Sequence, residues 1–218
     1  MLAGKDSGPE GTSGSMLTLR RAGDLGLLIE VDEGEVESLA SWLADGPLAD
    51  SIEDLVPTQR TVLVRAREGL DQIAALVRTH GWLGVPTSTT GRVTTFAISY
   101  DGPDLDDVCR QLGMERERLI ALHSGVEHRV AHFGFSPGFP YLAGSPASLR
   151  IPRRETPRTA ITPGAVAIAA GFTVIYPGGT PGGWNVIGTV DPPRFWDIDR
   201  TPPNLLALGD RIVFEPVE

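Results

Sequence analysis

Arg153 and Arg158 are the residues of this chain whose type and setting best suit the binding of an anion. Each directly follows a proline in the segment IPRRETPR, and proline fixes its own backbone torsion, which restricts how the next side chain is presented. A guanidinium group binds a carboxylate or a phosphate through two parallel hydrogen bonds. An anion-binding pair is therefore one interpretation of these arginines, and two solvated surface side chains are the other.

The segment YPGGTPGGW supplies a second kind of binding group. Its glycines, which include Gly182 and Gly183, let the backbone approach a ligand closely, so that backbone N–H groups could surround an anion or a carboxylate. A tight corner between two strands explains the same residues equally well. Tyr141 and Trp184 each combine an apolar ring with a polar edge and could line a pocket, although packing in a core is their more common fate.

Two other patterns offer chemistry that their neighbours do not support. Residues 134–138 match G-x-S-x-G, the nucleophile elbow of α/β-hydrolases, but Pro137 has no backbone N–H to donate to an oxyanion. His128 and His132 are four residues apart, yet two histidines make at most half of a zinc site, and the sequence has no cysteine pair or H-E-x-x-H motif to complete it. We expect no serine hydrolase, no metal centre, and a structural or solvent-facing role for these histidines.

Composition excludes several classes of function. Residues 1–124 carry the whole net charge of −9, whereas residues 125–218 are neutral, so no basic face is available for nucleic acid. Lys5 is the only lysine, which excludes a Walker-type phosphate loop and Schiff-base chemistry for this chain acting alone. No apolar run approaches the roughly 20 residues of a membrane span, and no signal peptide opens the sequence. We expect a cytoplasmic protein that binds neither nucleic acid nor a membrane.

The elements that must position these groups differ between the two halves of the chain. Before residue 125, short apolar runs alternate with segments in which apolar residues recur at i, i+3, i+4 and i+7. This pattern predicts strands at 27–31, 61–65 and 93–100 and helices at 36–43, 70–77, 105–112 and 116–122. We expect an α/β sandwich with helices on one side of a mainly antiparallel sheet, Cys109 in its core and Asp104 as a helix cap.

The sequence after residue 125 shows no strong helical period. Short strands separated by glycine–proline turns predict a β-barrel, with strands at 129–133, 165–169, 173–176, 185–189 and 211–214. Residues 1–15 are rich in glycine and serine, and we expect a disordered extension or residues foreign to the native protein. The predicted fold class is α+β, with the extension at 1–15, an N-terminal α/β sandwich domain at 16–124 and a C-terminal barrel at 125–218.

Several ordered motifs resemble one family. GFxPGFPYL at 134–142, P-R-x-x-x-P-R at 152–158, PGAVAIA at 163–169 and YPxxTPGGWxxIG at 176–188 closely resemble the B subunit of 5-oxoprolinase. That family is also called allophanate hydrolase subunit 1, and it includes a sporulation-kinase inhibitor. YDGPDL at 100–105 and LxxGDxxxF at 206–214 match as well, whereas the part before Tyr100 matches only in layout.

The resemblance implies a fold and a function. The C-terminal barrel is expected to be cyclophilin-like, and the chain to resemble half of the carboxyltransferase domain of urea carboxylase. Such proteins are similar to subunits that work with a homologous barrel protein, the C subunit, together with a separate A subunit to open 5-oxoproline to glutamate with ATP. The implied cofactor is ATP, with Mg²⁺, bound with or by the partner subunits. The chain alone is expected to be inactive.

On this resemblance the anion-binding candidates take roles in an amide-opening site. Arg153 and Arg158 would bind the substrate carboxylate. The backbone of Gly182 and Gly183, with the hydroxyl of Thr180, would bind carbonyl or phosphoryl oxygens. These roles make the segment between the barrel motifs the expected substrate site.

The remaining candidates would shape the pocket and handle protons. Tyr141 and Trp184 would form its walls, Arg154 would be structural, and His132 is the least unsuitable candidate for a general base. Two other functions stay open: a regulatory module that inhibits a histidine kinase without catalysis, and an enzyme subunit for allophanate or another ureido amide. Peptidyl-prolyl isomerase activity rests on analogy of fold alone.

Overall fold

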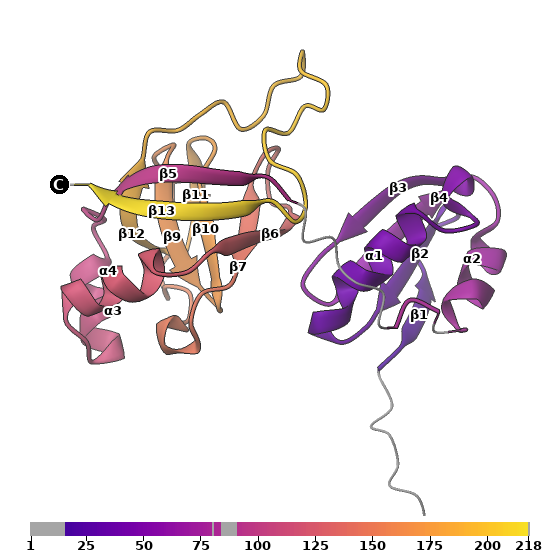
Figure 1. Cartoon of the computed structure of the whole chain (residues 1–218), viewed down its shortest axis with the longest axis horizontal. Helices are drawn as coiled ribbons and strands as arrows, with labels where there is room; N and C mark the ends of the chain where they lie inside the picture. Colours follow the sequence, from indigo (N-terminus) through magenta and orange to yellow (C-terminus); the bar gives the residue numbers. More distant parts are fainter. Residues whose placement is uncertain (1–15, 80, 84–90, 218) are drawn as a thin grey trace, which may run out of the picture. The chain divides into compact units, whose positions relative to one another are not determined.

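Two units make up the chain in the computed structural model, which describes residues 16–79, 81–83 and 91–217 (Figure 1). One unit comprises Met1–Val56 and Arg60–Val85, and the other Pro57–Gln59 and Pro86–Glu218. The extension expected at residues 1–15 lies outside the described residues. Within those described ranges, no helix is long and apolar enough to cross a membrane.

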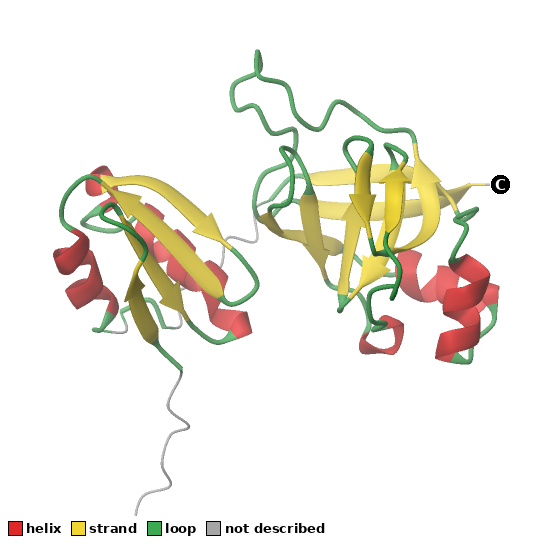
Figure 2. Cartoon of the chain, turned by 180° about the vertical axis from the view of Figure 1, so that it is seen from behind, coloured by secondary structure: helices red, strands yellow, loops and turns green. Residues whose placement is uncertain are grey.

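The first unit is a four-stranded sheet with helices on one face (Figure 2). Its strands lie in the order β1 (Thr18–Arg21), β2 (Gly26–Glu30), β4 (Thr61–Ala66) and β3 (Ile52–Pro57), with β2 antiparallel to both β1 and β4. Its helices are η1 (Glu33–Glu35), α1 (Val36–Ala44), η2 (Ala49–Ser51) and α2 (Leu70–Val77). Alternate residues of β2 and β4 share one apolar core with the buried faces of α1 and α2, as the periodicity predicted.

The second unit is built on a closed barrel. Its strands follow one another in the order β10, β7, β6, β13, β5, β12 and β9, and β9 pairs with β10 to close it. They span Val93–Ser99 (β5), His128–Phe133 (β6), Pro140–Ala143 (β7), Ala165–Ala169 (β9), Phe172–Ile175 (β10), Asn185–Val190 (β12) and Arg211–Val217 (β13). A separate antiparallel ribbon consists of β8 (Arg158–Ile161) and β11 (Thr180–Gly182), and the helices are α3 (Leu105–Leu112), α4 (Arg116–Ser124) and η3 (Ala147–Leu149).

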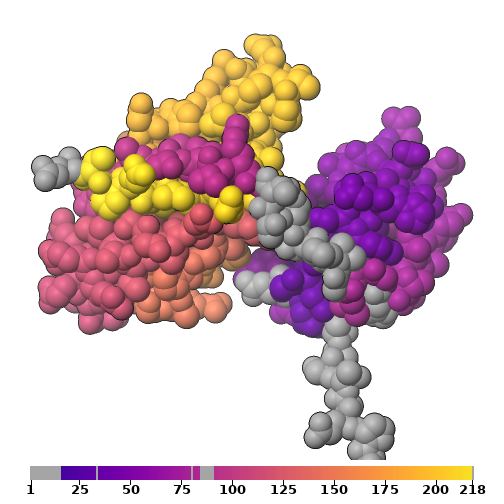
Figure 3. All heavy atoms as spheres, viewed as in Figure 1, coloured from indigo at the N-terminus to yellow at the C-terminus, as the bar shows by residue number. Residues whose placement is uncertain are grey.

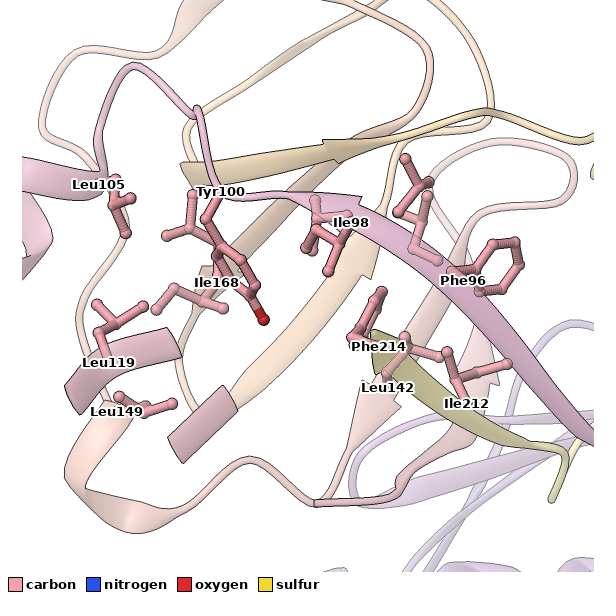
Figure 4. Packing of buried hydrophobic residues seen from close by; sticks show 14 of the residues in the cluster. Phe96, Ile98, Tyr100, Leu105, Leu119, Leu142, Leu149, Ile168, Ile212 and Phe214 are labelled. Carbon is pink, nitrogen blue, oxygen red and sulfur yellow. The ribbon is translucent and has the colours of Figure 1, made fainter. Parts of the chain in front are cut away.

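The core of the second unit fills the barrel. Figure 4 shows Ile98 of β5, Leu142 of β7 and Phe214 of β13 among the side chains gathered between the strands. Each is at most 1% exposed. The segment 191–210, which links β12 to β13, projects beside β5 and β13 and stands above their atoms in Figure 3.

Strand β5 corrects the domain boundary that we expected after residue 124. All seven residues of β5 pair in parallel with β13, and its end pairs with β12, so this strand is part of the barrel. Leu105 and Cys109 of α3 and Leu119 of α4 belong to the barrel core, so Cys109 is buried as expected but in the other unit. The boundary was misplaced because parallel pairing with the end of the chain is non-local and leaves no signal in the strand itself.

Asp104 connects the start of α3 to β12 and to the segment that leads into β8. Its carboxylate, 2% exposed, accepts a hydrogen bond from the backbone N–H of Val186 at 2.8 Å. Arg158 donates from both terminal nitrogens to the two carboxylate oxygens, each at 2.7 Å, and Arg154 also pairs with this carboxylate. The expected role was wrong in part: Asp104 stands at the N-cap position, but its carboxylate makes these contacts instead of capping α3.

Gly102 allows the turn before α3 to lie directly on β12. The backbone N–H groups of Gly102 and Asp104 donate to the carbonyl oxygens of Ile187 (3.2 Å) and Val186 (3.0 Å). A Cβ atom on Gly102 would lie 2.3 Å from the carbonyl carbon of Ile187, so any side chain here would push the turn away. The turn therefore delivers the Asp104 carboxylate to a fixed position.

Three buried histidines lie in and around the barrel wall. His123 Nδ1 is 2.8 Å from the Tyr100 hydroxyl and its Nε2 is 3.1 Å from the Thr173 hydroxyl, while His128 donates from Nε2 to the carbonyl of His123 at 2.9 Å. Burial lowers the pKa of His123 and His128, and it lowers the pKa of His132 to about 4. All three are therefore neutral in the folded protein at neutral pH.

The replacement Asp104→Asn should destabilise the second unit. Removing one partner of a buried ion pair costs about 3–5 kcal/mol, and because Arg154 and Arg158 remain 30% and 28% exposed, solvent offsets part of this, so we expect about 2 kcal/mol. Chemical denaturation measures the free energy of unfolding. The control is Asp106→Asn on an exposed part of α3, which should change it little; equal losses in the two variants would contradict the anchoring role of Asp104.

Acidification should also destabilise this unit. Below about pH 6.5 an unfolded histidine binds a proton, whereas a histidine with a lowered pKa resists it when folded, so stability falls as the pH drops from 6.5 toward 4. The melting temperature between pH 7.5 and 5 measures this effect. His132→Phe keeps a ring at this position but does not titrate, so its melting temperature should fall less steeply. Parallel curves for the two proteins would argue against the buried neutral histidine.

Candidate functional site

A cavity of about 110 Å³ brings together the motif segments of the second unit. Phe135 and Phe139 from the loop before β7, and Tyr141 from β7 itself, form one part of its lining. The rest consists of Arg153, Tyr176, Pro181, Gly182, Gly183 and Trp184. Five of the eight residues that the sequence assigned to the site therefore line one cavity: Tyr141, Arg153, Gly182, Gly183 and Trp184.

The cavity lies on the outer side of the barrel wall. Strand β9 is buried on both faces: Val166 and Ile168 join the barrel core, whereas its three alanines join a second apolar cluster. That second cluster contains Phe139, Tyr176 and Trp184. Because alanine side chains are small, the wall leaves depth for these large rings.

Aromatic rings form the walls of the cavity. Tyr141 meets Trp184 with ring centres 5.7 Å apart, and Phe139 meets Tyr176 at 5.0 Å, both edge to face. Phe135 meets Phe139 edge to face at 5.4 Å. Edge-to-face packing is a favourable arrangement of aromatic pairs, so these walls are mutually braced. Tyr141 and Trp184, which the sequence predicted as pocket walls, both line this cavity.

Phe135 combines a strained backbone with an exposed ring. Its φ angle is 65°, in the left-handed region that bulky residues rarely adopt, and its side chain is 65% exposed. Such strain persists only where the surroundings enforce it, and it clusters at ligand-binding sites. The same loop contains the rejected G-x-S-x-G match, and after Ser136 it continues through a turn into strand β7 instead of entering a helix.

Arg153 supplies the positive charge of the cavity. Its guanidinium carbon lies 5.5 Å from the centre of the Trp184 ring, within range of a cation–π contact. Among the described residues that line the cavity, no other is charged. A single cation above an aromatic wall suits a ligand with one negative charge.

The two tyrosines of the cavity are neutral hydrogen-bond donors at neutral pH. Burial raises the pKa of Tyr141, and it raises the pKa of Tyr176 to about 12, with the neighbouring Tyr141 adding to the effect. Arg153 acts in the opposite direction on both hydroxyls, as a nearby cation must. Both hydroxyls therefore keep their protons and can donate hydrogen bonds to a bound oxygen.

His132 lies behind the cavity. Its ring stacks on Tyr141 with centres 4.4 Å apart and planes 16° apart, and it meets Phe172 edge to face at 5.4 Å. It is 8% exposed and is not among the lining residues, so in this structure it supports Tyr141 rather than facing a ligand. A pKa of about 4 also makes it a weak base.

Arg158 and Thr180 also stand apart from the cavity. Both terminal nitrogens of Arg158 are used by Asp104, which replaces the substrate carboxylate that we expected as its partner. Thr180 begins β11 opposite Ile161, and its hydroxyl is buried without a hydrogen-bond partner among the described residues. The ion pair of Arg154 with Asp104 agrees with the structural role expected for it.

Sequence reasoning missed two residues that matter here. Asp104 was assigned to a cap, because an Asp before a helix is a common cap and its distant arginine partners are invisible in the sequence. Tyr176 entered as the first residue of the YPxxTPGGWxxIG motif, and nothing in the sequence marked its hydroxyl. The YP pair that opens the glycine-rich motif was the one available signal, because it places a ring directly before the loop.

Metal-binding side chains do not cluster in the described part of the chain. Within it, no cluster of three or more His, Cys, Asp or Glu side chains could hold a metal ion. His128 and His132, four apart on β6, are both buried among aromatic rings.

Several known proteins resemble this chain in both sequence and fold. The B subunit of 5-oxoprolinase from Escherichia coli O157:H7 is 36% identical over 185 residues, which cover 82% of this chain and 83% of the relative. That of Haemophilus influenzae is 43% identical over 113 residues, about half of each chain. The crystal structure of TTHA0988 matches with a TM-score of 0.72 and 34% identity over 89% of this chain and 40% of the longer one.

A more distant match concerns the fold alone. The crystal structure of the Kluyveromyces lactis urea carboxylase has a TM-score of 0.65 at 18% identity, covering 96% of this chain and 22% of that one.

Residues 17–206 match the family described as carboxyltransferase domain, subdomain C and D. The chain therefore belongs to this carboxyltransferase-domain family, and within it to the group of 5-oxoprolinase B subunits.

Proposed function

We propose that this chain is the B subunit of an ATP-dependent 5-oxoprolinase and that its aromatic cavity binds the substrate. The observation that carries the proposal is the cavity with Arg153 as its single cation, in a chain whose relatives are named as the B subunit of 5-oxoprolinase. 5-Oxoproline is a small, nearly flat lactam with one carboxylate. Its ring fits between aromatic walls, and its carboxylate matches one guanidinium group.

The cavity supports binding of the amide but not of the nucleotide. A volume of about 110 Å³ and one arginine do not fit ATP, whose triphosphate needs several cations or backbone donors. ATP would supply the phosphoryl group that activates an otherwise unreactive lactam carbonyl. We therefore assign the nucleotide site to the partner proteins, which are the A and C subunits of the enzyme.

The chemistry of the lining also calls for a partner. Tyr141 and Tyr176 are protonated at neutral pH, and His132 does not line the cavity, so the described lining offers no general base. Water must nevertheless be activated to open the lactam to glutamate. The role that fits this chain is to hold and orient the substrate while another subunit provides the base.

Reconstitution tests the proposal. The chain should form glutamate from 5-oxoproline with ATP when it is mixed with the A and C subunits, and the chain alone should form none. Replacement of 5-oxoproline by allophanate in the same mixture tests the ureido-amide alternative. No glutamate from the complete mixture, together with tight binding of the chain to a histidine kinase, would contradict the enzymatic proposal and favour a regulatory module.

Removal of the cavity cation should weaken substrate binding. A hydrogen bond to a charged group contributes about 1.5–3 kcal/mol, so Arg153→Gln should raise the KM of the complex for 5-oxoproline by roughly ten- to a hundredfold. Steady-state kinetics of glutamate formation measures this. Arg150→Gln removes a nearby exposed arginine outside the cavity lining and serves as the control, with KM unchanged. An unchanged KM in the Arg153 variant would contradict the assignment.

A further inference from the structure

Tyr176 is the most deeply buried polar side chain of the cavity lining, at 1% exposure. We propose that its hydroxyl donates a hydrogen bond to the carboxylate of the bound ligand, beside Arg153, and that Gly182 is the residue that makes space for this hydroxyl. The ligand class is a small monocarboxylate with a flat ring. The inference rests on the proposed function for the identity of the natural ligand, but not for the chemistry of the site.

The hydroxyl of Tyr176 is available to a ligand. A buried tyrosine normally finds a partner for its hydroxyl, because an unpaired buried polar group costs free energy. The described residues give the Tyr176 hydroxyl no hydrogen-bond partner, and its oxygen is not among their buried side-chain atoms that lack one, so it is accessible from the cavity that Tyr176 lines. By contrast, the hydroxyl of Tyr100, the other tyrosine in a core, is paired with His123 at 2.8 Å.

The absence of a side chain at Gly182 leaves the space that the Tyr176 hydroxyl occupies. A Cβ atom on Gly182 would lie 2.3 Å from the Tyr176 hydroxyl oxygen and 3.1 Å from the ring carbon that carries it. A methyl group at this position would therefore displace the end of the tyrosine ring. Gly182 pairs with Arg158 across the β8–β11 ribbon, and Arg158 is held by Asp104, so the ion pair sets the position of the glycine over the ring.

The donors around the cavity select the charge of the ligand. Its polar side chains are the hydroxyls of Tyr141 and Tyr176, the guanidinium of Arg153 and the indole N–H of Trp184, all of which can donate hydrogen bonds. The described lining contains no carboxylate. One cation with neutral donors suits a group with one negative charge, such as a carboxylate, better than a doubly charged phosphate. Burial keeps the Tyr176 hydroxyl protonated, with a pKa raised to about 12, so it remains a donor.

The test uses the full chain and three ligands measured by calorimetric titration. The ligands are 5-oxoproline, its neutral carboxamide, and cyclopentanecarboxylate, which keeps the acid but lacks the lactam. Tyr176→Phe should weaken binding of both acids about tenfold and leave the carboxamide almost unaffected. Tyr100→Phe also removes a buried hydroxyl but lies outside the cavity lining, so it should lower thermal stability without changing the affinity for any ligand.

Gly182→Ala provides a second, independent variant. It should weaken acid binding to a similar extent and lower the melting temperature, because the added methyl group collides with Tyr176. In the double variant with Tyr176→Phe, the closest collision is absent, so the melting temperature should recover in part and the loss of affinity should be less than additive. Full additivity would overturn the proposed fit between these two residues.

The outcomes separate this inference from the proposed function. Acid binding that is unchanged in Tyr176→Phe, or equal loss for the acid and the carboxamide, overturns the inference. So does a wild-type chain that binds neither acid. If both acids bind and Tyr176→Phe weakens them, but the complete mixture of subunits forms no glutamate, the carboxylate site stands and the 5-oxoprolinase proposal fails.

Discussion

The buried carboxylate of Asp104 is the interaction on which the rest of the site depends. It lies where three segments from different parts of the chain meet: the turn before α3, strand β12, and the proline–arginine segment that enters β8. Isolated charges are expensive to bury, so this arrangement persists only because two guanidinium groups and a backbone N–H satisfy the carboxylate together. The charge cluster thus converts a loop into a fixed support.

The cavity follows from this support and from the barrel wall beneath it. The small alanine side chains of β9 leave room on the outer face of the barrel. The ribbon of β8 and β11 is fixed by the ion pair of Arg158 with Asp104, and aromatic rings pack between the ribbon and the barrel. Arg153 is left over the Trp184 ring because its neighbours Arg154 and Arg158 are engaged with Asp104. Two adjacent arginines in one motif therefore have different roles: the Arg154 side chain pairs with the Asp104 carboxylate, and Arg153 lines the cavity.

Local sequence patterns predicted many of the single helices and strands. They could not predict which distant segments pair with one another. The helices α1, α2 and α3 follow from apolar periodicity, because each buries a regular face, and the strands β2, β4 and β9 follow from short apolar or β-branched runs. The short strands β7, β8 and β11 were missed, since each has only three or four residues, too few to show an alternating pattern, and β8 and β11 pair with each other across the intervening β9 and β10. The same limit misplaced β5 and hid the bond between Asp104 and Arg158. The aromatic and glycine-rich motifs pointed to residues that line the cavity, but a strand corner or a core position explained the same residues, and nothing local in the sequence showed which arginine does not pair with Asp104.

The central claim is that the free guanidinium of Arg153 receives a carboxylate between aromatic walls. A crystal structure of the chain with 5-oxoproline tests it most directly. The account predicts the ligand ring against Trp184, with its carboxylate within hydrogen-bond distance of Arg153 and with the pair of Asp104 and Arg158 intact. A ligand bound elsewhere, or one in this cavity with its carboxylate turned away from Arg153, would contradict the account.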